Sequence, residues 1–559
     1  MSGVVQDTSL EKSEITKRFF AREHGVVALI LSCVVLISLY LRVSDYGFYE
    51  DDYWGIVPFF KTSISQAWTE TVYHMETWPT GRPLNHILPE WFSLVGYKIA
   101  GVQGIYFLGF LVNFTNAFLL YFLLRRWIDR WSAILGGCLF VLLPADTTRI
   151  FLLHNSHVHI SLTFLLVALL LKRTRFQVLA YPIAGLSLLS YETAFLPFIV
   201  FPLFFVDRAK RIFGWVIHLT GCATILAIVF GIRLHLSDAR ANSVLAGPGV
   251  TLWRMISSMW IGPETSLKTL VKAFLQAPHS QPPFAFLFAG LVAILLLIVP
   301  RAIRGSAEAA GKNTSDRLDS VKVLLAGLAS WIFAYALTLT NYPPTQLAGR
   351  LTSTHVAAVF GLACAMAAGA AYLRSFGHLL KVLTTGAMTV IVALFTLYSF
   401  RIQSGFASAW AGERAFWSRV IQLCPDITSN TRIILTGREA RQNEFILTNS
   451  WADLHVLEDA FGGGARPILF YYDGMAKAAD IRFEDGQITW KPFFWGDKRE
   501  TLNLDDVILL RDNGEQITRI DEFQIPGVPF PLHSKPSVSA AAQPLPSPLT
   551  DFGRFLLAR

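Results

Sequence analysis

The chain is poor in charged residues and in cysteine. Charged side chains make up 16% of its 559 residues and hydrophobic ones 53%, and many of the latter form long uninterrupted runs. This composition excludes an ordinary water-soluble domain. There are five cysteines, and four of them, Cys33, Cys138, Cys222 and Cys364, lie within apolar runs. The cysteines therefore indicate neither a disulfide framework nor a cysteine-based metal site.

Two further features are missing. No internal repeat of fixed period is visible, although weak symmetry among the apolar runs would not show in this way. No small-residue cleavage pattern follows the first apolar run, so we expect that run to be retained as a signal anchor. The basic residues behind the formal net charge of +8 lie mostly beside the apolar runs, so the charge does not indicate nucleic-acid binding.

The apolar runs predict an all-α polytopic membrane bundle. The expected number of spans is about eleven, from runs whose lengths approach that of a bilayer-crossing helix. They cover residues 26–41, 105–124, 133–143, 160–171, 178–189, 194–206, 215–232, 284–299, 323–339, 355–373 and 380–400.

Basic residues set the expected orientation. They gather in every second connection, as in Arg125, Arg126 and Arg130 after the second run and Lys172 and Arg173 after the fourth. Cytoplasmic loops carry this excess, so the amino-terminal segment 1–24 is expected inside the cell. With an odd number of spans, everything beyond residue 400 lies on the opposite side, a periplasm or a lumen.

The region after residue 400 changes character. Residues 432–435 and 468–472 read as short strands, 439–445 is compatible with a helix, and 462–464 marks a turn. We therefore expect a transmembrane domain over 25–400 and a small extracytoplasmic α/β domain over 401–525. A Pro-, Ser- and Ala-rich tail, 526–559, is expected to be disordered up to its last hydrophobic residues.

Polar residues gather on the expected non-cytoplasmic face. The acidic triplet Glu50, Asp51 and Asp52 follows the first run, and acidic residues near a membrane boundary are costly enough to suggest a function. The loop behind it holds two amphipathic, aromatic segments, 56–68 and 84–99, which are typical of interfacial helices. Between them, a glycine and a proline flank Arg82 in a predicted turn. Polar residues clustered at one surface indicate a site at the mouth of the bundle.

These features together resemble the GT-C fold membrane glycosyltransferases. The stretch Tyr49, Glu50, Asp51, Asp52 and Tyr53 is similar to the acidic motif of the protein O-mannosyltransferase and lipid A aminoarabinose transferase group. The turn around Arg82 resembles bacterial relatives that include the phage-type O-antigen glucosyltransferases. The resemblance covers roughly residues 20–400 and specifies a superfamily better than a member.

The resemblance implies transfer of a sugar from a polyprenyl-phosphate donor to an envelope lipid, polysaccharide or protein, with inversion at the anomeric carbon. Asp51 matches the first acid of the family pair and is the expected general base. Asp52 would orient Asp51, bind the acceptor or help to hold a metal. Arg350 is the leading candidate for the donor phosphate, with Arg82 and Arg149 in reserve. Any one of these arginines could instead be an interfacial anchor that reaches to water.

Four further residues are candidates for substrate contacts: Tyr53, His154, His157 and Glu192. His154 and His157 stand three apart and could share a cation, or could hydrogen-bond the donor phosphate as neutral imidazoles. Whether the protein binds a divalent cation as cofactor is therefore left open. Glu192 could receive a sugar hydroxyl or form a structural ion pair with an arginine.

Two other classes remain open. A transporter or lipid flippase would place ionisable or glycine-broken segments near mid-bilayer, and the centres of the expected spans carry few charges. A non-catalytic scaffold would leave the one-sided polar cluster unexplained. The identity of the sugar, the acceptor and the polyprenol does not follow from the sequence.

Overall fold

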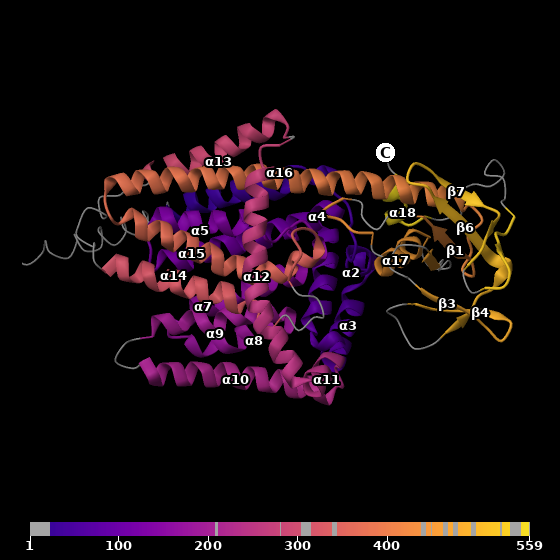
Figure 1. The fold of residues 1–559 in the computed structure, drawn as a ribbon, viewed down its shortest axis with the longest axis horizontal. Coiled ribbons are helices and arrows are strands. Elements are labelled where there is room, and N and C mark those ends of the chain that lie inside the picture. Colours follow the sequence, from indigo (N-terminus) through magenta and orange to yellow (C-terminus); the bar gives the residue numbers. More distant parts are fainter. Residues whose placement is uncertain are drawn as a thin grey trace, which may run out of the picture.

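The computed structural model describes residues 23–206, 211–279, 281–302, 315–337, 344–437, 443–448, 450–461, 468–472, 479–492, 499–525, 528–536 and 549–557. Figure 1 shows the helices of a long bundle running along the longest axis, with a β-rich region at one end. The bundle contains the first span Glu23–Asp45, α4 (Leu84–Arg125), α5 (Arg130–Leu142), α7 (Ile160–Leu171), α8 (Ala180–Ser190), α9 (Leu196–Val200), α10 (Arg211–His235), α13 (Pro283–Ala302), α14 (Ser315–Phe333), α15 (Val356–Arg374) and α16 (His378–Leu423).

All eleven expected runs fall on helical structure, although 323–339 ends outside the described residues. Six helices in the described ranges are long and apolar enough to cross a membrane, and they begin at residues 23, 84, 152, 211, 350 and 378. Four more are apolar but shorter, at 10–17 residues. A helix of 13 residues such as α5 spans about 20 Å, less than the roughly 30 Å hydrocarbon core. A polytopic membrane bundle is supported, whereas a count of eleven is not established.

Small residues bring α14 and α15 together. A side chain on Gly361 of α15 would lie 2.3 Å from the backbone nitrogen of Trp331, and one on Gly327 of α14 would lie 2.6 Å from that of Ala365. Helices that associate in lipid gain little from hydrophobic burial, so close backbone packing at small residues holds them together. This contact places the loop before α15, which carries Arg350, against the rest of the bundle.

The first loop forms helices in both segments where the sequence predicts interfacial helices, with shifted bounds. Segment 56–68 is split into a 3₁₀ turn, Val57–Lys61, and α3 (Ile64–Thr77). Ser63 and Gln66 form a capping box that starts α3, because each side chain bonds the backbone N–H of the other. The segment 84–99 is the first part of α4, separated from the remainder by a break at Ala100 and Gly101. Gly101 has φ +59° and ψ −142°, a conformation open essentially to glycine.

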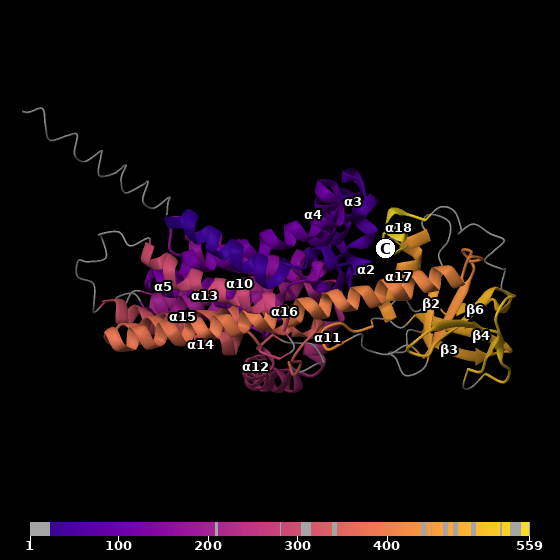
Figure 2. The same ribbon diagram turned by 90° about the horizontal axis from the view of Figure 1, so that it is seen from above.

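One long helix, α12 (Pro248–Gln276), has no counterpart among the expected elements. It follows the short α11 (Ala239–Ala246) and crosses the bundle nearly at right angles to the long axis (Figures 1 and 2). Its exposed face includes Trp253 and Trp260, at 69% and 77% exposure. Such a face is typical of a helix lying in the membrane interface.

Helix α16 joins the bundle to the β-rich region (Figure 1). It continues past residue 400, the expected end of the last span, to Leu423. The strands beyond it are β1 (Arg432–Thr436), β2 (Ile468–Tyr472), β3 (Ala479–Glu484), β4 (Gln487–Pro492), β5 (Glu500–Thr501), β6 (Val507–Asp512), β7 (Ile517–Ile520), β8 (Glu522–Phe523) and β9 (Leu532–His533). Both strands expected from the sequence, 432–435 and 468–472, are confirmed as β1 and β2.

The main sheet has the order β2-β1-β6-β7, with β1 parallel to both of its neighbours and β7 antiparallel to β6. Strands β3, β4 and β5 form a second sheet, and α17 (Ser450–Phe461) follows β1 in the chain. The expected turn at 462–464 and most of the expected helix at 439–445 lie outside the described residues. Within the tail, β9 and α18 (Asp551–Leu557) are ordered elements, whereas 537–548 are outside the described ranges.

Candidate functional site

The acidic triplet sits in a tight turn between the first span and the short helix α2 (Asp52–Gly55). Glu50 adopts a left-handed backbone conformation with φ +48°, which directs the chain sharply into α2. The side chain of Asp52 is fully buried, and its two carboxylate oxygens accept the backbone N–H groups of Leu153, at 2.8 Å, and Tyr49, at 3.2 Å. Asp52 therefore ties its own turn to the start of α6 (Leu152–His154).

Asp51 is the partly exposed member of the triplet and meets Arg350. The Nη1 group of Arg350 donates to Oδ2 of Asp51, and its Nε lies 3.4 Å from Oε2 of Glu50. Arg350 begins the 3₁₀ turn η11 (Arg350–His355) directly after Gly349, whose φ of +84° favours glycine. The side chains of Asp51 and Arg350 are 14% and 19% exposed, so both can reach a ligand. The expected base and the leading phosphate-binding candidate thus lie together.

Burial raises the pKa of the other two acids of the triplet, Glu50 and Asp52. Burial raises the pKa of Glu50 to about 8, against the opposing effects of Arg350 and of the Leu447 N–H that donates to Glu50 Oε1 at 3.0 Å. Burial likewise raises the pKa of Asp52 to about 7, against its backbone hydrogen bonds. Near neutral pH, Glu50 is therefore mostly protonated, and Arg350 pairs chiefly with Asp51.

The loop between α5 and α6 packs on the segment that carries Arg350. Thr147 donates its backbone N–H to Thr352 Oγ1 at 3.0 Å, and its own Oγ1 accepts from the Gly349 N–H at 2.9 Å. Two residues further along the chain, Arg149 is buried, with its Nε 3.3 Å from Asp146 Oδ2. The guanidinium of Arg149 also stacks over Phe140, 4.9 Å from the ring centroid. The Arg149 side chain is therefore enclosed within its own loop, whereas the Arg350 side chain on the neighbouring segment is partly exposed.

The histidine run forms a π-helical turn, η5 (Asn155–His159), after α6. The rings of His154 and His157 face one another at 6.0 Å between centroids, and both side chains are buried. His159 points elsewhere, with Nε2 3.6 Å from Asp146 Oδ2. Within the described ranges, no group of three or more His, Cys, Asp or Glu residues is placed to hold a metal ion. Two imidazoles are an incomplete donor set, so His154 and His157 do not by themselves fit a divalent cation.

Glu192 is buried and pairs with two arginines, Arg82 and Arg233. Arg82 Nε lies 2.7 Å from Glu192 Oε2, and Arg233 Nη2 donates to Glu192 Oε1 at 3.0 Å. Arg233 also donates to the Gly81 carbonyl at 2.9 Å, which fixes the turn that holds Arg82. Arg82 further lies over the ring of Tyr191, at 5.3 Å from its centroid. The structural ion pair anticipated as one interpretation of Glu192 is therefore present, with a carboxylate shared between two guanidinium groups.

A short segment that follows β1, residues 443–448, reaches the acidic turn. Asn443 Nδ2 donates to the Gly405 carbonyl at 2.7 Å, and Glu444 pairs with Lys272 of α12 at 2.8 Å and Arg401 of α16 at 2.7 Å. Three residues later, the Leu447 N–H reaches Glu50. We refer to residues 443–448 as the strap. It links α12, α16 and the acidic turn.

Helix α18 covers the other side of the turn. The ring of Phe552 lies 5.8 Å from Phe48 and 6.3 Å from Tyr53, and Phe555 stacks on Trp410 at 5.5 Å. Tyr53, a candidate for substrate contact, is itself buried, so its ring packs beneath α18.

Comparisons with known proteins give one distant match. No protein-family model and no curated protein matches the chain. Among solved structures, the crystal structure of ArnT from Cupriavidus metallidurans bound to undecaprenyl phosphate matches at 13% identity and a TM-score of 0.33. The match covers 75% of this chain and 83% of that one. ArnT is a lipid A aminoarabinose transferase, one of the groups that the acidic motif resembles. A likeness this distant does not transfer residue roles, so the roles below rest on this chain's own contacts.

Proposed function

We propose that the chain is a membrane glycosyltransferase that moves a sugar from a polyprenyl-phosphate donor to an envelope lipid, polysaccharide or protein. The observation that carries the proposal is the pairing of Asp51 with Arg350 at the mouth of an apolar helix bundle. A carboxylate can take a proton there, and a guanidinium can hold a phosphate beside it. The proposed location is the inner membrane, with the amino terminus in the cytoplasm and the site on the outer face.

In the proposed reaction, an acceptor hydroxyl attacks the anomeric carbon of the donor sugar. The bond between that carbon and the phosphate oxygen breaks, and the phosphate leaves with the electron pair. Asp51 accepts the hydroxyl proton, and attack from the side opposite the phosphate inverts the anomeric centre. The product sugar is then joined to the acceptor, and polyprenyl phosphate is released.

Arg350 is proposed to stabilise the leaving phosphate. Its planar guanidinium can bind two phosphate oxygens at once, a geometry that lysine does not reproduce. When the donor enters, its phosphate competes with Asp51 for this group, which leaves the Asp51 carboxylate open to the acceptor. A neutral Glu50 favours this exchange, because an ionised Glu50 would hold Arg350 more strongly.

The remaining candidates take positioning roles in this proposal. Asp52 would fix the turn that carries Asp51 through its two backbone hydrogen bonds. The pair of Arg82 and Glu192 is proposed to shape the wall of the site, because both charges are already matched. His154 and His157 are proposed to bind the donor as neutral hydrogen-bonding groups.

The test measures release of polyprenyl phosphate from a panel of polyprenyl-phosphate sugars by the purified full-length protein, with a crude envelope extract as acceptor. Asp51→Asn should abolish turnover while leaving donor binding at least as tight as in wild type, because the donor phosphate no longer competes with the Asp51 carboxylate for Arg350. Arg350→Lys keeps the charge but loses the two-pronged contact, so it should lower turnover by roughly 10- to 100-fold.

The matched control is Asp45→Asn, which removes an exposed carboxylate six residues before Asp51. Turnover unaffected by Asp51→Asn would refute the base assignment. Movement of the donor lipid across a vesicle membrane without any release of polyprenyl phosphate would instead favour a transporter or flippase.

A further inference from the structure

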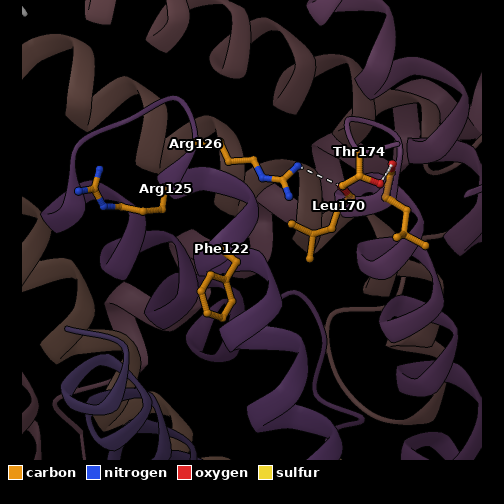
Figure 3. Close-up of a pocket in the computed structure, with 6 residues that line it drawn as sticks. Phe122, Arg125, Arg126, Leu170 and Thr174 are labelled. Atoms are coloured by element: carbon orange, nitrogen blue, oxygen red, sulfur yellow. Dashed lines mark hydrogen bonds between the residues drawn. The ribbon is translucent and has the colours of Figure 1, made fainter. Parts of the chain in front are cut away.

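A concave surface lies at the opposite end of the bundle from the acidic turn. It is a shallow cavity of about 470 Å³, lined by Phe122, Arg125, Arg126, Leu170, Leu171 and Thr174 (Figure 3). Helix α4 connects the two places, since Tyr106 near one end bonds the Gly47 carbonyl and Tyr121 near the other bonds Glu23. The 21 residues from Ile105 to Arg125 extend about 30 Å along the helix. The cavity therefore lies about one hydrocarbon thickness away from the proposed active site.

Positive charge gathers at this cavity. Arg126 Nη1 donates to the neutral carbonyl of Leu170 at 3.1 Å across the cavity, as Figure 3 shows, and this is its one hydrogen bond within the described residues. Glu23 lies 3.4 Å from Arg125, but both of its oxygens already bind Arg130 at 2.7 Å. One carboxylate thus faces two arginines, and Arg126 bonds only a neutral group in the part of the chain that the structure describes.

Arg173, which follows the end of α7, adds to the positive charge near Arg126. Burial, and then the proximity of Arg173, hold the pKa of Arg126 below its usual value. Arg173 itself donates to the Phe205 carbonyl at 2.9 Å, another neutral group. An anion between these arginines would relieve their mutual repulsion.

An aromatic stripe leads away from the cavity along α4. Successive rings of Phe107, Phe110, Phe114, Phe118 and Phe122 lie 6.3, 6.3, 5.6 and 4.6 Å apart. All five side chains are at least partly exposed. The stripe extends about 22 Å, more than the roughly 15 Å that half of the hydrocarbon core requires. It offers a continuous apolar surface to one extended acyl chain, and it ends at the arginines.

We propose that this cavity binds an anionic glycerophospholipid, with its phosphodiester at Arg126 and an acyl chain along the phenylalanine stripe. Arginine suits the phosphodiester because its fork pairs with two oxygens. Basic pockets between helices at a membrane boundary are suited to such headgroups. A free phosphate would use the arginines but not the apolar stripe. The proposed ligand is thus a lipid, bound at a site separate from the one where sugar transfer is proposed.

The test uses the full-length protein in lipid nanodiscs of phosphatidylglycerol and phosphatidylcholine, followed by native mass spectrometry of the retained lipids. Wild type should retain phosphatidylglycerol in preference to phosphatidylcholine. Arg126→Gln should lower this retention about fivefold, the factor that one basic side chain contributes near an anionic surface. Arg126→Lys should keep part of it. The matched control is Arg211→Gln, which removes an exposed arginine of α10 that stacks on Trp215 and does not line the cavity.

Three outcomes would overturn the proposal. One is equal retention of both lipids by wild type. Another is an equal loss with Arg126→Gln and Arg211→Gln, which would indicate a diffuse charge effect. The third is complete displacement of the lipid by inorganic phosphate, or by added polyprenyl phosphate, which would show that the site recognises another ligand. Each outcome concerns binding alone, so none depends on the transferase activity.

Discussion

Replacing Glu50 with glutamine should remove a pH dependence from the stability of the protein. Burial raises the pKa of Glu50 from 4.5 to about 8. Between these two values the folded state keeps the proton and the unfolded state loses it, so the free energy of unfolding falls as the pH rises. Above about pH 8 both states are ionised, and this contribution stays constant. Glu50→Gln is neutral throughout and lacks the effect.

The magnitude follows from the size of the shift. A difference of about 3.5 pKa units corresponds to about 5 kcal/mol, lost at about 1.4 kcal/mol per pH unit between roughly pH 4.5 and pH 8. Glutamine keeps the carbonyl oxygen that accepts the Leu447 N–H, so the strap contact can persist. The wild type should therefore become less stable relative to Glu50→Gln as the pH rises through this window.

The assay is denaturant unfolding of both proteins in detergent at a series of pH values. Asp45→Asn serves as the control, because the Asp45 side chain is about half exposed. Parallel stability curves for wild type and Glu50→Gln would refute the reasoning, because they would mean that Glu50 has the same proton affinity in both states. A difference that grows with pH only above about pH 8 would refute it as well.

Three further predictions concern the surroundings of the site. Glu192→Gln should destabilise the protein by about 3–5 kcal/mol in thermal unfolding, because Arg82 and the buried Arg233 lose the carboxylate they share. Glu264→Gln, at an exposed ion pair, should change the stability by less than about 1 kcal/mol, and similar effects of the two substitutions would contradict this. Phe552→Ala should weaken the packing of α18 on the acidic turn by about 3 kcal/mol or more, and so raise amide hydrogen exchange over residues 551–557. Unchanged protection of these amides would contradict the packing described. Glu444→Gln should speed hydrogen exchange at the Leu447 amide and lower turnover. Faster exchange with full turnover would show that the strap is not needed for the reaction.

The bundle was largely predictable because long apolar runs reveal it directly. Strands β1 and β2 were predictable for a similar reason, since short β-branched and aromatic runs are bounded by turn residues. Helix α12 was missed because its apolar residues recur with helical spacing among charges such as Glu264 and Lys268, so it contains no continuous run. A search for helical periodicity in addition to apolar length would have found it.

The meeting of Asp51 and Arg350 could be anticipated from topology alone. Both were expected at the same face, and an ion pair between them needs only that the loops approach each other. The partners of the other site residues could not be anticipated. Arg233 stands next to a long apolar run and reads as a boundary residue, yet it shares Glu192 with Arg82. The strap and α18 reach the acidic turn only through tertiary packing, which no local pattern encodes.

The strap also bears on the order in which the protein can become functional. Glu50 and the Leu447 amide that binds it are 397 residues apart in the chain. A ribosome adding about 5–20 residues per second needs roughly 20–80 s to cover that distance. During this interval the acidic turn is already made but lacks the strap and α18, so its side chains can have neither their final burial nor their final proton affinities. A nascent chain would thus carry the proposed base long before it could use it, and a product that stopped before residue 443 would insert its helices without completing the site.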